Sequence, residues 1–279
     1  MDYKIKETIE LNNCPLCASK SFEFLYNDFN NIPYVFCNDC SLVFQNPRSI
    51  IDYEQDYWSM SKDPDGALRD LMSEDERKFK VKNRLINEIK YVNSLPGGKI
   101  LDAGCGPGFF LAEINDNWEK YGLELSEYNI NYIKKIFPYI NAEIGVLEEM
   151  PYKDNFFDIV YCFQVMEHVQ NPVKIIKEFG RVCKPNGKII ISTPNINSFC
   201  SKRFKSNYRL LGAPHIIMWS PITMKKLFDI IGFKVFKEYY PYFKTDYFTI
   251  KNIMRLFNKN KISPPFYGNE MNLYAEIDL

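Results

Sequence analysis

The chain has 279 residues, which is enough for one large domain or for one domain with a small appendage. Its 35 basic and 35 acidic side chains cancel, so no strong field would attract nucleic acid or an anionic membrane. No apolar run approaches the length of a membrane span, and the amino terminus lacks the apolar core of a secretory signal. We therefore expect a cytoplasmic protein without a membrane span and without a nucleic-acid partner.

Two C-x-x-C pairs stand near the amino terminus: Cys14 with Cys17, and Cys37 with Cys40. This arrangement predicts four thiolates around one tetrahedral zinc ion. The zinc would be structural, because no coordination position stays open. Free thiols or a redox pair are the alternatives, although redox pairs usually stand at the head of a βαβ helix.

Residues 1–48 are therefore expected to form a zinc ribbon, with strands at 34–36 and 42–44 flanking the second cysteine pair. The polar composition of residues 49–73 predicts a linker, and an amphipathic helix is expected from Ser73 onward. The remaining cysteines stand in apolar contexts and are expected to be small core residues. These are Cys105, Cys162, Cys183 and Cys200.

A glycine-rich turn follows the apolar strand predicted at 99–104. Gly104, Gly106 and Gly108 remove the Cβ atoms that would keep a ligand from the backbone. Such a turn, opening a helix at the carboxyl end of a strand, binds nucleotide-like ligands in open α/β sheets. The alternative is a tight connection without a ligand.

The spacing of this turn favours a particular kind of ligand. A dinucleotide fingerprint needs a small residue where Phe109 stands, so a nicotinamide oxidoreductase is disfavoured. Asp102, just before the turn, would repel a pyrophosphate and suits a ligand that carries an amino group. Glu124 ends the next predicted strand, about twenty residues further on, where a carboxylate can hold ribose hydroxyls.

Strands and helices alternate through the rest of the chain, which predicts a parallel, doubly wound sheet. Strands are expected at 99–104, 119–125, 142–147, 157–163 and 187–193, and helices near 108–116, 127–137 and 171–183. Two further strands are expected at 233–236 and 273–277, separated by an insertion near 241–270 that carries a helix at 250–257.

These features resemble the class I S-adenosylmethionine-dependent methyltransferases over residues 75–240. The motifs that carry the resemblance are residues 101–108, Glu124, residues 156–160, the sequence Glu167-His168-Val169, and residues 185–194. The resemblance implies a Rossmann-like, seven-stranded α/β sheet whose last strand is antiparallel, in a domain spanning 74–279. It also implies that residues 49–73 could form a flap over the cofactor instead of a linker.

The resemblance further implies which residues hold S-adenosylmethionine (SAM). The glycine turn would hold its methionine part and Glu124 its ribose, while the segment after the third strand would line the adenine. Many members have Gly-Asp in that segment, where this chain has Gly145 and Val146. The adenine contact then relies on backbone near Leu147 or on Glu148. Gln164 is a further candidate, for the cofactor or for the acceptor.

Only two histidines are present, and both are predicted at the rim where α/β sheets place their sites. A hydroxyl acceptor must lose its proton, and histidine is the usual base near neutral pH. We hypothesise that His215 or His168 is this base. His215 is preferred, because the Glu-His pair of related sequences often serves in packing. Asn195 and Tyr208 could face the acceptor or could be structural.

A small acceptor bearing phosphate is suggested by a basic cluster after the fifth strand, although such residues can also form a solvated helix face. The cluster consists of Lys202, Arg203, Lys205 and Arg209. A zinc ribbon joined to this domain resembles enzymes that methylate nucleotide-linked sugars or surface-polysaccharide precursors, and O-methylation is expected. The alternatives are a sugar C-methyltransferase and a non-catalytic SAM-binding scaffold that docks a partner through the ribbon. The oligomeric state is not indicated.

Overall fold

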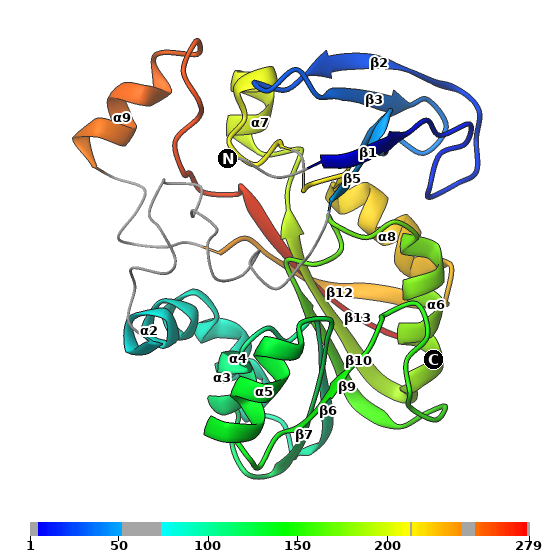
Figure 1. Cartoon of the computed structure of the whole chain (residues 1–279), viewed down its shortest axis with the longest axis vertical. Helices are drawn as coiled ribbons and strands as arrows, with labels where there is room; N and C mark the ends of the chain where they lie inside the picture. Colours follow the sequence, from blue (N-terminus) through cyan, green and yellow to red (C-terminus); the bar gives the residue numbers. More distant parts are fainter. Residues whose placement is uncertain (1–4, 52–73, 213, 242–248, 278–279) are drawn as a thin grey trace.

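The computed structural model describes residues 5–51, 74–212, 214–241 and 249–277. A layered α/β domain occupies one half of the molecule, and a smaller β-rich lobe stands over one end of its sheet (Figure 1). The expected helix cap Ser73 and most of the expected linker or flap lie outside the described residues.

The central sheet has seven strands in the order β12-β13-β10-β9-β6-β7-β8. Strands β6 to β10 pair in parallel, whereas β13 is antiparallel to both of its neighbours. The expected doubly wound sheet with an antiparallel last strand is therefore confirmed. The strands are β6 (Gly98–Ala103), β7 (Trp118–Glu124), β8 (Asn141–Ile144), β9 (Phe157–Phe163), β10 (Cys183–Pro194), β12 (Phe233–Tyr239) and β13 (Glu270–Ile277).

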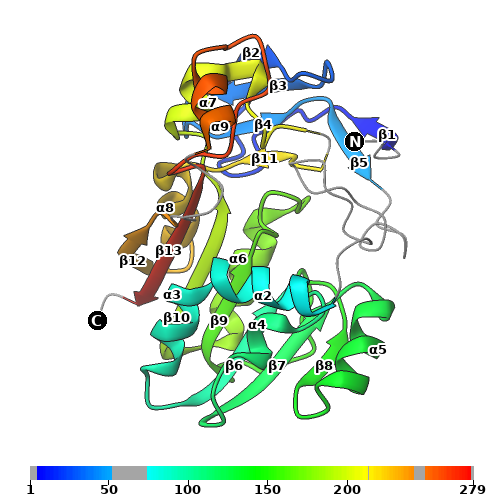
Figure 2. The ribbon, with the colours of Figure 1, turned by 90° about the vertical axis from the view of Figure 1, so that its left-hand side faces the viewer.

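Helices cover both faces of this sheet (Figure 2). The strands are buried on both sides, so neighbouring residues point into different cores: Leu101 packs with α6 and α8, and Ile100 packs with α3, α4 and α5. These helices are α3 (Ile86–Asn93), α4 (Phe109–Ala112), α5 (Glu127–Ile136), α6 (Pro172–Val182) and α8 (Pro221–Asp229). Ser126, Asn171 and Ser220 cap α5, α6 and α8 by accepting backbone N–H bonds.

Several element boundaries differ from the sequence-based expectation. The helix expected to run on from Ser73 is divided at Leu85 into α2 (Glu74–Arg84) and α3. The third strand ends at Ile144 instead of 147, and helix α4 ends at Ala112 instead of 116. Composition assigns residues 49–51 to a linker, but they belong to strand β5 (Arg48–Ile51). This strand pairs with β1 (Ile5–Ile9).

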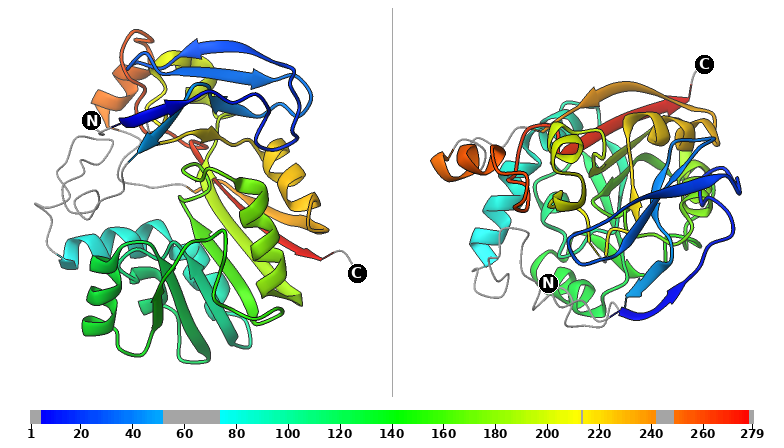
Figure 3. Two further views of the ribbon diagram at one scale, coloured as in Figure 1. Left: turned by 45° about the vertical axis from the view of Figure 1, so that its right-hand side comes forward. Right: turned by 90° about the horizontal axis from the view of Figure 1, so that it is seen from above.

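The smaller lobe contains a second sheet in the order β11-β4-β3-β2. Three of its strands come from the expected ribbon: β2 (Phe22–Asn27), β3 (Pro33–Cys37) and β4 (Val43–Gln45). The fourth, β11 (Ile217–Met218), belongs to the segment that follows β10 and pairs with β4. The ribbon is thus joined by hydrogen bonds to a loop of the larger domain. The left view of Figure 3 shows the blue strands of this lobe above the larger domain.

Two more helices complete the described chain beside this lobe. Helix α7 (Phe199–Phe204) continues into a short 3-10 helix, η2 (Lys205–Asn207), and helix α9 (Ile250–Leu256) confirms the helix expected in the insertion. The Arg203 side chain donates a hydrogen bond of 2.7 Å to the Leu256 carbonyl, which ties α7 to α9. None of the described helices has the length and hydropathy needed to cross a bilayer.

Candidate functional site

The glycine turn between β6 and α4 presents an open surface at its centre. Gly104, Gly106 and Gly108 have φ values of +85°, +50° and +77°, a region that L side chains rarely adopt. A Cβ on Gly104 would lie 2.5 Å from Val165, and one on Gly108 would lie 3.0 Å from Ile133. A Cβ on Gly106 would meet nothing within 4 Å. Gly106 is therefore the position where a ligand can approach the backbone.

Two buried carboxylates border this turn. Glu124 accepts hydrogen bonds from the Gly106 and Ser126 backbone N–H groups at 2.9 and 3.0 Å. The Asp102 side chain is 3% exposed. Burial, reinforced by the negative charge of Glu124, raises the pKa of Asp102 to about 8. A cationic ligand would offset the cost of ionising Asp102, so the two carboxylates suit the amino group and the ribose hydroxyls of SAM.

The raised pKa of Asp102 makes the stability of the ligand-free protein depend on pH. The folded protein keeps a proton on this carboxyl that the unfolded chain releases above its ordinary pKa of 3.8. The contribution of this bound proton to the free energy of unfolding is fully present below pH 3.8 and is lost as the pH rises through about 8. We therefore expect Asp102→Asn to stabilise the ligand-free protein at pH 8 by on the order of 1–3 kcal/mol, and by much less at pH 5. Thermal unfolding of both proteins at the two pH values measures this, and parallel pH profiles would contradict it.

The segment expected to line the adenine follows β8. The Gly145 N–H donates to the Glu124 carbonyl at 3.1 Å, so this loop runs beside the end of β7. Leu147 and Glu148 are half-buried here, and Leu147 packs against the core. Their contact with the adenine stays a prediction.

The two histidines lie side by side although they are far apart in the sequence. His168 follows β9, His215 precedes β11, and their ring centroids are 4.8 Å apart. The His168 Nδ1 lies 2.7 Å from the Pro214 carbonyl oxygen, and the His215 Nδ1 lies 2.5 Å from the Leu210 carbonyl oxygen. Burial lowers the pKa of His215, which favours a neutral imidazole near pH 7.

Glu167 is the functional candidate that sequence reasoning assigned to packing. Its side chain is fully buried, and its Oε2 accepts a 3.1 Å hydrogen bond from the Thr193 hydroxyl. Its Oε1 is buried without a hydrogen-bond partner and lies 3.8 Å from the His168 Nε2. Glu167, His168 and His215 thus form one cluster, which the structure brings to the rim where the histidines were expected.

The other polar candidates have structural partners. Gln164, with a φ of +54°, donates from its backbone and its side chain to Ser192. The Asn195 side chain caps its own loop by bonding to Asn197 and Gly268, and the buried Tyr208 hydroxyl donates to backbone carbonyls. The structural alternative therefore accounts for Asn195 and Tyr208.

An ion pair that the sequence did not indicate also lies near the cluster. Arg84 contacts Glu270 at 2.6 Å and stacks over the Phe163 ring at 4.7 Å from its centroid. The two charged residues are 186 positions apart, so no local pattern could have paired them.

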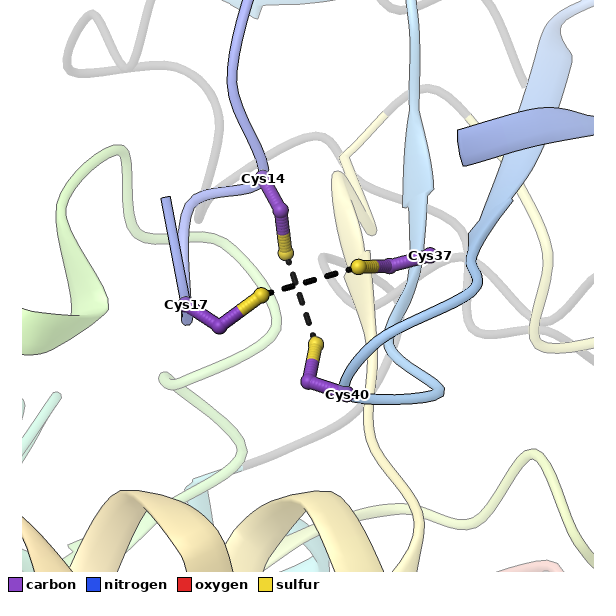
Figure 4. Close-up of side chains that lie close together, drawn as sticks. All are labelled: Cys14, Cys17, Cys37 and Cys40. Carbon is purple, nitrogen blue, oxygen red and sulfur yellow. Dashed lines mark hydrogen bonds between the residues drawn. The ribbon is translucent and has the colours of Figure 1, made fainter. Parts of the chain in front are cut away.

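The four ribbon cysteines converge on one point (Figure 4). The Sγ atoms of Cys14 and Cys40 are 3.5 Å apart, those of Cys17 and Cys37 are 3.6 Å apart, and all four lie within 4.8 Å of one another. Thiolates at about 2.3 Å from a tetrahedral zinc lie about 3.8 Å apart, whereas disulfide sulfurs lie about 2.0 Å apart. The cluster therefore fits one zinc ion.

The two cysteine pairs have the same local backbone structure. In each, the N–H four residues after the first cysteine donates to its carbonyl at 2.9 Å: Ala18 to Cys14, and Ser41 to Cys37. Ala18 and Ser41 both have positive φ values. This repeated turn directs both thiols of a pair to the same side. The other four cysteines are buried, as expected of small core residues.

Comparisons with known proteins agree with this architecture. A family model described as a methyltransferase domain matches residues 75–238. A protein of Mycolicibacterium smegmatis named "Probable S-adenosylmethionine-dependent methyltransferase" is 30% identical over 140 residues, which cover 50% of this chain and 53% of that protein. A "Ubiquinone biosynthesis O-methyltransferase" of Coxiella burnetii is 29% identical over 181 residues, covering 61% of this chain and 68% of the relative.

Solved structures share the fold at low sequence identity. A chain of the complex between the Haloferax volcanii Trm112 methyltransferase activator and its methyltransferase has a TM-score of 0.58 at 13% identity, covering 74% of this chain and 95% of that one. A Pyrococcus horikoshii protein has a TM-score of 0.55 at 16% identity, covering 81% and 100%. The chain spans between about half and two thirds of the curated relatives it matches. Because the matched family model covers more than half of the sequence, the chain belongs to this methyltransferase-domain family.

Proposed function

We propose that this protein transfers the methyl group of SAM to a hydroxyl group of a small acceptor. The single observation that carries the proposal is the backbone at Gly106. It is open where a Cβ would point, and it is flanked by the buried carboxyl of Asp102 and by the carboxylate of Glu124. This set matches a ligand that has both an amino group and a ribose.

The described residues support this chemistry by position and by charge. When bound, SAM supplies an electrophilic methyl group on a sulfonium, so the protein's main task is to align the acceptor for in-line attack. The glycine turn follows β6, and the histidine cluster follows β9 and β10, at the same edge of the sheet. His215 is a neutral imidazole near pH 7 and suits the role of the base that removes the hydroxyl proton.

The acceptor class is the finer part of the proposal. O-methylation is supported by the name of the Coxiella burnetii relative, which is an O-methyltransferase. An acceptor that bears phosphate, such as a nucleotide-linked sugar or a surface-polysaccharide precursor, would suit the exposed basic side chains of Lys202 and Lys205. Part of that basic cluster has another role, since Arg203 binds the Leu256 carbonyl.

The decisive experiment combines calorimetry with a transfer assay. We expect saturable SAM binding and, with labelled SAM, transfer to at least one acceptor in a panel of nucleotide sugars and other phosphorylated metabolites. His215→Asn keeps a side-chain N–H for the Leu210 carbonyl but removes Nε2. It should lower turnover by about 10²–10⁴-fold with SAM affinity unchanged.

The possible negative results separate SAM binding from the role of His215. No heat of SAM binding would refute the proposed function, and near wild-type turnover of His215→Asn would refute the role of that residue. SAM binding without transfer to any acceptor would favour the alternative of a non-catalytic scaffold.

A further inference from the structure

We propose that Glu167, His168 and His215 form a second metal site, which binds a divalent transition-metal cation such as Mn²⁺, Fe²⁺ or Zn²⁺. The site is separate from the zinc ribbon and lies at the sheet edge where the acceptor is expected. Its role in the reaction rests on the proposed function, but its binding of metal does not.

The spacing of the donor atoms suits one ion. One carboxylate oxygen of Glu167 and one ring nitrogen from each histidine lie within 4.8 Å of one another. The His168 Nε2 is 3.8 Å from the Glu167 Oε1. Ligands about 2.1 Å from an ion lie roughly 3 to 4.2 Å apart, depending on whether they are adjacent or opposite. Only small rotations of the side chains would bring all three onto one ion.

The carboxylate of Glu167 provides an independent indication of a missing cation. The side chain is fully buried, and Thr193 satisfies Oε2 while Oε1 has no hydrogen-bond partner. A buried carboxylate oxygen without a partner is costly, because the water that would solvate it has been removed. This oxygen is the one that faces the His168 Nε2. A cation between them would supply the missing partner.

The hydrogen bonds of both imidazoles prepare their Nε2 atoms for coordination. The Nδ1 of His168 contacts the Pro214 carbonyl, and that of His215 contacts the Leu210 carbonyl. A carbonyl oxygen can only accept, so each Nδ1 carries a proton and Nε2 is the ring nitrogen left to bind a cation. Metal-binding histidines are oriented by this kind of outer hydrogen bond.

The type and number of ligands indicate the class of metal and its role. Two imidazoles and one carboxylate suit first-row transition cations, whereas Mg²⁺ and Ca²⁺ prefer oxygen ligands only. Three protein ligands leave coordination positions open for the acceptor oxygen. With its Nε2 bound to the cation, His215 would be a ligand instead of the base. The cation would then lower the pKa of that hydroxyl, and the proton would pass to water. The acceptor O–C bond then forms as the S–CH₃ bond breaks, and the sulfur keeps the electron pair as a thioether.

Mn²⁺ is the appropriate probe, because thiolate ligands select Zn²⁺ and the ribbon will not exchange its metal for Mn²⁺. Full-length protein with zinc in the ribbon is titrated with MnCl₂, and free Mn²⁺ is followed by its EPR signal. We expect one Mn²⁺ to bind per chain. Glu167→Gln preserves the size of the side chain and should weaken binding by at least about tenfold. Glu143→Gln, on exposed strand β8, is the matched control and should bind like the wild type.

Two outcomes would overturn the metal site: no Mn²⁺ binding by the wild type, or equal binding by Glu167→Gln. The wild-type titration decides the question even if Glu167→Gln fails to fold. SAM calorimetry on the same samples separates this proposal from the proposed function. A protein that binds SAM but not Mn²⁺ refutes only the metal site. A protein that binds Mn²⁺ but not SAM refutes only the proposed function.

Discussion

Replacing Gly106 with leucine is expected to abolish SAM binding while the protein stays folded. A Cβ at this position would point into open space, where nothing lies within 4 Å, so the new side chain would fill the space assigned to the cofactor. The φ of +50° adds a backbone cost on the order of 1–2 kcal/mol, which a folded domain can tolerate. Calorimetry should show a loss of affinity of at least about 100-fold, since the bound pose is excluded sterically.

Gly232 offers a matched control for this experiment. It has a φ of +73°, and a Cβ there also meets nothing within 4 Å, but it lies between α8 and β12. Gly232→Leu therefore carries a similar backbone cost without entering the glycine turn. It should lower the melting temperature about as much as Gly106→Leu does, with SAM affinity unchanged. If both variants bind SAM normally, the cofactor does not lie against Gly106.

Replacing Cys37 with serine is expected to remove zinc from the ribbon. It is also expected to stop methyl transfer, although Cys37 lies outside the proposed active site. A structural zinc site contributes directly to folding, so the ribbon should lose its structure when one thiolate is removed. The ribbon holds the loop that carries His215. The Tyr34 hydroxyl lies 3.1 and 2.9 Å from the Gly212 and His215 carbonyl oxygens and can donate to either, and Gln45 donates to the Gly212 carbonyl at 2.9 Å. Losing these bonds should release His215 from His168.

The expected result of Cys37→Ser is a split between two measurements. Zinc content should fall by about one ion per chain and turnover by at least about 100-fold. SAM affinity should change little, because the glycine turn and Glu124 belong to the other lobe. Cys183→Ser replaces a buried thiol outside the ribbon and controls for the general cost of such a change. A Cys37→Ser protein that keeps its zinc, or that loses zinc without losing turnover, would contradict this coupling.

The zinc ribbon and the glycine turn were predictable because their residues are neighbours in the chain. The C-x-x-C spacing places both thiols of a pair on one turn, and the two pairs occupy equivalent turns. The glycine spacing likewise predicts the open backbone at Gly106, and the alternation of apolar segments predicts the doubly wound sheet. In each case the signal is local, since a few consecutive residues carry both the conformation and the chemistry.

By itself, then, the sequence determined the four-cysteine cluster, the glycine turn with its two carboxylates, and the class of the fold. Only the tertiary structure decided that His168 lies beside the loop of Pro214 and His215, with a bond that joins residues 46 positions apart. It also decided that Glu167 is buried with an unpaired oxygen, and that β11 completes the ribbon sheet. These contacts join distant segments. Their geometry depends on how the layers pack, and no local spacing carries that information.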